Sequence, residues 1–216
     1  MITRIIVALV LAPLFLAVLI FFPPVMLAVM VAGIGALASY ELLRATQVAH
    51  HNGMYILTAL AAAVIPVGHW LGAGSWTARA VTLALMALLF FLAIRLYGTQ
   101  RAVRAEHLMV CLFAGAVIPL FLSALIQLKG MENGRGFVLL PVGCAFTTDI
   151  GAYFAGVFLG KQRGITQVSP NKSLEGYVGG ILSGCLLMLV YGLLVQNFGG
   201  LPVKLPVMAL YGLLGS

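Results

Sequence analysis

The chain has 216 residues, of which 62% are hydrophobic and only 8% are charged. This composition excludes a soluble globular domain, because a soluble domain of this length needs a charged surface around its core. The 12 Lys and Arg against 5 Asp and Glu give a formal charge of +7. The basic residues mark the ends of apolar segments and form no patch, so no nucleic-acid partner is expected. The solvent for most of this chain is therefore a lipid bilayer.

Apolar runs long enough to cross a hydrocarbon layer of roughly 30 Å follow one another along the chain. Turn and helix-stopping residues such as Pro23, Pro24 and Gly53 separate them. A last apolar run, 205–214, is too short to span, and we expect it to be part of an eighth span. The sequence thus predicts an all-α polytopic transmembrane helical bundle, forming a single membrane domain over 1–216. Its seven complete spans are expected near 5–22, 25–43, 54–72, 78–98, 107–128, 137–159 and 176–196.

The distribution of cations predicts the orientation of these spans. With the N-terminus in the cytoplasm, eight Lys and Arg face the cytoplasm and four lie outside, as the positive-inside rule favours. The loops around Arg101 and Arg163 then face the cytoplasm, where nucleotides are available. The four outside cations are Arg79, Lys129, Arg135 and Lys204.

The chain's Cys and His residues predict no metal site of their own. The three cysteines, Cys111, Cys144 and Cys185, lie in apolar runs without the spacing of metal ligands, so we expect small buried hydrophobic side chains. His50 and His51 are adjacent and therefore point in different directions. A solvated loop is the simpler interpretation of this pair.

Glycines predict where two spans meet. Gly156 and Gly160 form one GxxxG pattern, and Gly176, Gly180 and Gly184 form two more. Small residues allow close backbone approach between helices in lipid, where no hydrophobic force drives association. We therefore expect the sixth and seventh spans to be in contact.

Asp149 lies near the middle of the sixth apolar run. An ionised carboxylate facing lipid at this depth costs at least about 2.5 kcal/mol, so the side chain is expected to face protein, water or an ion. Helical spacing places Tyr153, Gly156 and Gly160 on or near the same face. A buried Asp hydrogen-bonded to a neighbouring helix is the structural alternative.

The most polar stretch of the chain follows Gly160. Lys172 is a compact charge suited to phosphate oxygens, and nearby Ser hydroxyls can donate to phosphate or help to hold a metal. Ser173 is typical of a helix start, where free N–H groups favour phosphate. A cytoplasmic basic loop followed by an N-cap is the simpler alternative. The stretch carries Lys161, Arg163, Ser169, Lys172, Ser173 and Glu175.

Two ordered blocks here resemble the central motifs of phosphatidate cytidylyltransferases, also called CDP-diacylglycerol synthases. The first block runs from Thr148 to Gly156, and Gly160-Lys161 follows it. The second runs from Ser169 to Gly176, with Gly179-Gly180 beyond it. The resemblance implies Mg²⁺-dependent transfer of CMP from CTP to phosphatidate, giving CDP-diacylglycerol and pyrophosphate in phospholipid biosynthesis. It also implies a bacterial cytoplasmic (inner) membrane enzyme whose site faces the cytoplasm, and favours a homodimer.

The same resemblance suggests a role for each matching residue. Asp149 and Lys172 are the expected catalytic residues, and Asp149 binds metal or orients Lys172. Phosphate or substrate contacts are expected from Lys161, Ser169, Lys172, Ser173 and Glu175. In-line attack on a phosphorus needs positioning and cations but no covalent nucleophile. The family's further acidic metal ligands should follow the eighth span, beyond Ser216, so we expect this chain alone to have little activity.

Two functions of other classes compete with this interpretation. A membrane transporter or lipid-handling channel would use Asp149 as a proton or ion relay, but it leaves the loop around Lys172 unexplained. A non-catalytic scaffold would use the GxxxG faces to recruit a partner, and loss of Lys172 would not affect it. Other CTP-dependent lipid enzymes, acting on ether lipids or polyprenols, remain alternatives within the enzyme class.

Overall fold

The computed structural model describes residues 12–47, 52–99, 102–162, 172–198 and 203–216. The regular elements of these residues are helices, which confirms the predicted all-α class. Six of the helices are long and apolar enough to cross a membrane. The chain is therefore described as a polytopic integral membrane protein.

The helices agree with six of the predicted spans to within a few residues. The fifth predicted span is one continuous helix with a wider π turn in its middle, made of α5 (Ala105–Leu112), η1 (Phe113–Val117) and α6 (Ile118–Gly130). The remaining long helices are α2 (Pro24–Ala45), α3 (Asn52–Trp70), α4 (Gly74–Leu96), α8 (Leu139–Phe158) and α9 (Leu174–Phe198). Of the predicted first span, residues 12–20 are described and helical. The cytoplasmic placement of the N-terminus stays a prediction.

Two shorter helices complete the described elements. The single turn α7 (Gly134–Phe137) precedes α8 in the chain. The last helix, α10 (Leu205–Gly215), has 11 residues and coincides with the short apolar run near the end of the sequence.

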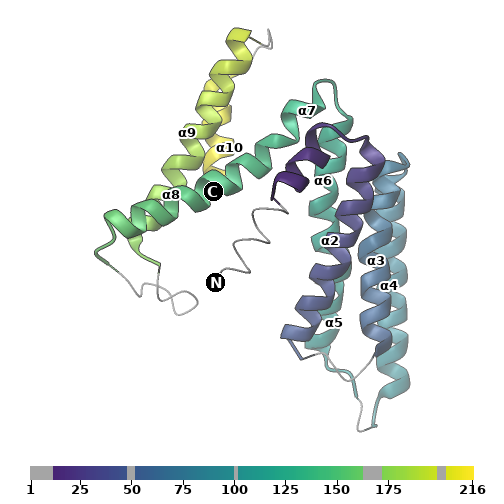
Figure 1. Cartoon of the computed structure of the whole chain (residues 1–216). Coiled ribbons are helices and arrows are strands. Elements are labelled where there is room, and N and C mark those ends of the chain that lie inside the picture. The colour runs from purple at the N-terminus through teal and green to yellow at the C-terminus, as the bar shows by residue number, and fades with distance from the viewer. Residues whose placement is uncertain (1–11, 48–51, 100–101, 163–171, 199–202) are drawn as a thin grey trace. The chain divides into compact units, whose positions relative to one another are not determined.

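The chain divides into two compact units, Met1–Arg135 and Gly136–Ser216, which we call the first and the second unit. In the first unit, α2, α3, α4 and α6 run side by side (Figure 1). Leu43, Met54, Leu89 and Cys111 contribute to its buried core.

Helix ends in the first unit follow from local chemistry. Pro24 starts α2 at a position where the missing N–H is not needed. After α3, Gly72 adopts a φ of +77°, and the N–H of Ala73 bonds to the carbonyl of Gly68 at 3.0 Å. This left-handed glycine closes the turn into α4 and satisfies carbonyls at the helix end. At the end of α6, Lys129 Nζ donates to the carbonyl of Val18 at 2.7 Å.

The second unit is built on close contact between α8 and α9, with α10 packed on α9 (Figure 1). A Cβ atom at Gly176 would lie 2.9 Å from the carbonyl oxygen of Ala152, and one at Gly180 would lie 3.2 Å from that of Thr148. Only glycine permits this approach, so the predicted contact between the sixth and seventh spans is confirmed.

The three cysteines are free. Cys111 and Cys144 are buried as expected, while Cys185 is only partly buried. The Sγ of Cys185 lies 3.6 Å from the carbonyl oxygen of Ala209, a weak hydrogen bond between α9 and α10. His50 and His51 lie outside the described residues.

Candidate functional site

A pocket of about 390 Å³ opens in the second unit between the middle of α8 and the start of α9. It brings together residues from the two sequence blocks that surround the polar stretch. The residues that line it are Asp149, Ala152, Tyr153, Gly156 and Val157 from α8, and Lys172, Ser173, Gly176 and Tyr177 from the start of α9.

The α8 side of the pocket is the face that helical spacing predicted. Asp149, Tyr153 and Gly156 all line the pocket, and Asp149 is exposed in the described part of the second unit. Within these residues Asp149 is therefore not buried against a neighbouring helix. Gly160 lies beyond the end of α8, which ends at Phe158, so it does not continue this helical face.

Ser173 is the N-cap of α9, as its position in the sequence predicted. Its Oγ accepts a hydrogen bond from the N–H of Gly176 at 3.1 Å, and the residue is 2% exposed. The N–H of Leu174 bonds to the carbonyl of Gln162 at 3.1 Å, and that of Tyr177 bonds to the carbonyl of Ser173.

These bonds give the N–H groups of Leu174 and Gly176 partners within the chain. The expectation that free N–H groups at the start of α9 receive phosphate stays a prediction. The helix dipole still favours an anion at this end of α9.

Lys172 is the cation of the pocket. Its side chain is exposed, and Nζ lies 5.4 Å from the centre of the Tyr177 ring, within the range of a cation–π contact. Among the described residues, which include all five acids of the chain, the only ion pair joins Arg104 and Glu106. Asp149 and Lys172 therefore share the pocket without forming an ion pair with each other.

Glu175 and Lys161 form a separate cluster beside the pocket. The Glu175 carboxylate lies near the backbone of Lys161 and Gln162 and near the Lys161 ammonium. Its Oε2 atom is buried without a hydrogen-bond partner in the described part of the chain. Glu175 thus lies beside the turn that follows α8. Ser169 lies outside the described residues, so its predicted contact stays a prediction.

Tyr177 is the pocket residue that sequence reasoning missed. It follows the N-cap Ser173 by four residues, and this spacing places both on one face of α9. The aromatic ring provides the surface beside which the Lys172 ammonium lies. The helical periodicity of α9, read from its N-cap, would have identified Tyr177.

The donor set fits a weakly held divalent cation. Within the described residues, no three His, Cys, Asp or Glu side chains come together as a metal site. Mg²⁺ is commonly held by one or two carboxylates, with substrate phosphates and water as the other ligands. Asp149 supplies one accessible carboxylate of this kind, so the residues present fit an ion that arrives with a phosphate substrate.

The fold and the pocket together define the class of protein to which this chain belongs. The chain is a polytopic helical membrane protein with a pocket that presents a carboxylate and an ammonium between two glycine-packed helices. Such a pocket suits a phosphate-bearing ligand, because one charge contacts phosphate oxygens and the other can hold a metal.

Comparison with known proteins identifies the family. A profile of the cytidylyltransferase family matches residues 2–216, and the chain belongs to this family. Phosphatidate cytidylyltransferases are among its relatives. The one from Bacillus subtilis is 33% identical over 72 residues, which cover 33% of this chain and 27% of that protein. The one from Mycobacterium tuberculosis is 33% identical over 78 residues, covering 36% of this chain and 24% of that protein.

A longer match is found to the phosphatidate cytidylyltransferase of Staphylococcus saprophyticus. It is 27% identical over 124 residues, which cover 57% of this chain and 47% of that protein. The chain thus spans between about a quarter and about half the length of these relatives.

Proposed function

We propose that the protein transfers CMP from CTP to phosphatidate and thereby forms CDP-diacylglycerol and pyrophosphate. A phosphate oxygen of phosphatidate attacks the α-phosphorus of CTP, and the bond from this phosphorus to the oxygen that bridges to the β-phosphate breaks. The observation that carries the proposal is the pocket at the start of α9, which both Asp149 and Lys172 line. Membership of the cytidylyltransferase family supports a CTP substrate.

The pocket residues contribute positioning and charge. Lys172 binds phosphate oxygens and offsets the negative charge that develops as pyrophosphate leaves. The Tyr177 ring holds the ammonium near this position. No protein nucleophile is needed, since the lipid phosphate itself attacks.

Asp149 is the proposed ligand for Mg²⁺. The ion, when bound, would neutralise phosphate charge during the transfer. Ser173 has a structural part in the proposal, because its Oγ caps α9 and thereby fixes the residue before it, Lys172. Lys161 and Glu175 stabilise the adjoining turn, and Lys161 adds positive charge near the phosphates.

Location and assembly follow from the proposed reaction. CTP is a cytoplasmic nucleotide, so the pocket is proposed to open to the cytoplasm from the bacterial inner membrane. A homodimer remains part of the proposal. Gly156, Gly176 and Gly180 pack within the chain, so a dimer would use a different surface.

Replacement of Lys172 tests the proposal in the full-length protein that contains these residues. Membranes carrying Lys172→Ala should convert radiolabelled CTP and phosphatidate to CDP-diacylglycerol with kcat/KM lowered on the order of 100-fold. Lys172→Arg keeps the charge and should retain more activity. Lys204→Ala is the matched control, because Lys204 precedes α10 and does not line the pocket.

Full activity of Lys172→Ala in correctly inserted protein would refute this assignment. Ion or proton flux that depends on Asp149, in protein without any cytidylyltransferase activity, would favour the transporter instead.

A further inference from the structure

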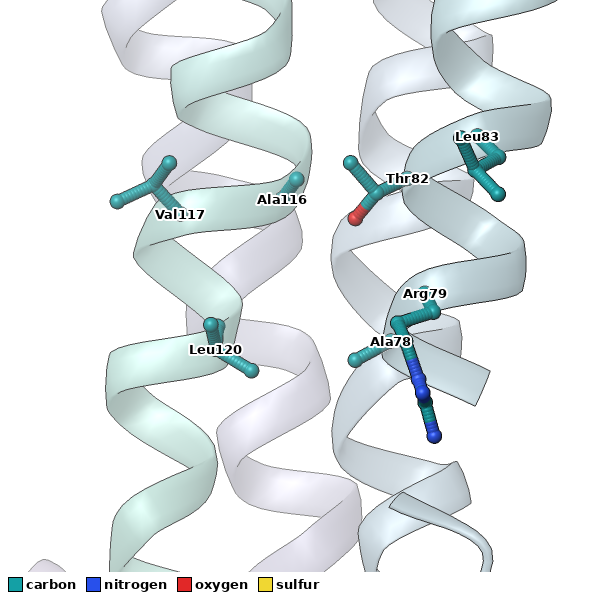
Figure 2. Close-up of a pocket in the computed structure, with 7 residues that line it drawn as sticks. All are labelled: Ala78, Arg79, Thr82, Leu83, Ala116, Val117 and Leu120. Atoms are coloured by element: carbon teal, nitrogen blue, oxygen red, sulfur yellow. The ribbon is translucent and has the colours of Figure 1, made fainter. Parts of the chain in front are cut away.

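A second pocket, of about 500 Å³, lies in the first unit between α4 and the segment where η1 continues into α6. Figure 2 shows Ala78 and Thr82 of α4 on the side that faces Ala116 and Leu120. Small side chains at Ala78 and Ala116 leave the space open, and Leu83, Val117 and Leu120 complete an apolar lining. We call this pocket the α4–α6 groove.

One charged residue, Arg79, lines the α4–α6 groove. Its Nε donates to the carbonyl of Ser75 at 2.9 Å, and the guanidinium carbon lies 4.9 Å from the centre of the Trp76 ring. These two contacts hold the guanidinium near the start of α4. All five acids of the chain lie in the described residues, and none is in an ion pair with Arg79. The terminal guanidinium donors therefore have no acidic partner among the described residues of the first unit.

An apolar groove with one unpaired cation matches the chemistry of a phospholipid. Its volume is in the range of pockets that hold small ligands. In a helix that crosses a bilayer, the occupant of an apolar groove is a hydrocarbon chain rather than water. Arginine pairs with phosphate through two parallel donors, and Trp side chains are enriched at the depth of lipid headgroups. Trp76 lies in the first turn of α4, where the helix begins.

We infer that the α4–α6 groove binds an acyl chain of a bulk membrane phospholipid with a net negative headgroup, whose phosphate contacts Arg79. This lipid is a bound component of the first unit and not the lipid that reacts. The inference is independent of the chemistry assigned to the second unit.

The two tryptophans of the chain provide a direct test, since Trp76 stacks on Arg79. Replacement of Trp70, and of any tryptophan outside these 216 residues, by Phe leaves Trp76 as the single tryptophan. The purified full-length protein is reconstituted in phosphatidylcholine, and phosphatidylglycerol with brominated acyl chains is titrated in. Quenching of Trp76 should show about five-fold selectivity for phosphatidylglycerol over brominated phosphatidylcholine, as expected for one cation at the membrane surface.

Two variants in the groove and one control variant define the site. Arg79→Gln should reduce the selectivity to about one, while Arg95→Gln, at the other end of α4, should leave it unchanged. Ala78→Leu fills the α4–α6 groove and should also lower the selectivity, because the acyl chain can no longer seat beside Arg79. Circular dichroism on each variant confirms that it remains folded.

Three results would overturn the inference. The first is equal quenching by the two brominated lipids in the parent protein, and the second is unchanged selectivity in folded Arg79→Gln. The third is selection of brominated phosphatidate but not phosphatidylglycerol, because the groove would then serve the reacting lipid. Equal selection of phosphatidate and phosphatidylglycerol supports a site for bulk anionic lipid.

Discussion

Gly179 in α9 offers a direct test of the packing that creates the candidate site. A Cβ added there would overlap the Cβ of Ala155 in α8 and would lie 3.1 Å from the carbonyl oxygen of Gly151. Both neighbours are fixed to the backbone, so no side-chain rotation can relieve the overlap. Carbon atoms pack best about 3.5–4.0 Å apart, and the two helices would have to separate by about 1 Å. We expect Gly179→Ala to lower the free energy of unfolding by about 1–3 kcal/mol.

The measurement is an SDS titration in mixed micelles, followed by circular dichroism. Ala155→Gly removes the opposing methyl group, so the double variant should recover about 1 kcal/mol or more relative to the sum of the two single changes. Gly143→Ala is the control in α8, because its Cβ would meet only a terminal methyl of Leu187, at 3.4 Å. We expect the control to change stability by about 0.5 kcal/mol or less.

Either of two results would refute the packing argument. One is a Gly179→Ala protein that unfolds at the same SDS concentration as the parent. The other is a cycle in which the effects of Gly179→Ala and Ala155→Gly simply add.

Two further changes test other parts of the fold with the same titration. Ser173→Ala removes the cap on the N–H of Gly176 and should cost about 0.5–2 kcal/mol; a neutral result would contradict the capping role. Gly115→Ala would place a Cβ 3.2 Å from the carbonyl oxygen of Thr58 and should cost about 1–3 kcal/mol. Gly33→Ala, with nothing within 4 Å, is its control, and equal effects of these two changes would contradict the proposed close contact.

The spans could be predicted because lipid imposes a length and a composition on them. Each spanning helix must satisfy its own backbone, so long apolar runs separated by turn residues give the helices directly. The ends differ by a few residues, since capping chemistry decides them. For example, α3 begins at Asn52 and α4 at Gly74, both earlier than the apolar runs that predicted these spans.

The π turn in the fifth span was not predictable from hydropathy. Pro119 has no N–H to donate to the carbonyl of Gly115, and the helix widens over Phe113–Val117 just before it. Every residue of this segment is apolar or small, so the composition is the same as that of a regular span. The change is one of hydrogen-bond register, which hydropathy does not report.

The candidate site was predictable in its members but not in its arrangement. Asp149 is conspicuous as a charge within an apolar run, and Ser173 as a capping residue. Sequence reasoning assigned phosphate contacts to both Lys172, which lines the pocket, and Lys161, which lies beside Glu175. That difference depends on where α8 ends and on the hydrogen bonds of the following turn. Both are details of three-dimensional structure.

The pair Gly179 and Ala155 also links packing to chemistry. Asp149 belongs to α8, and Lys172 immediately precedes the α9 cap, so the distance between the two helices sets the width of the pocket. If that distance matters for the reaction, Gly179→Ala should lower kcat/KM at temperatures where the protein is still folded. Ala155→Gly should then restore both stability and activity. Restored stability without restored activity would mean that helix spacing is not what positions Asp149 and Lys172 for the transfer.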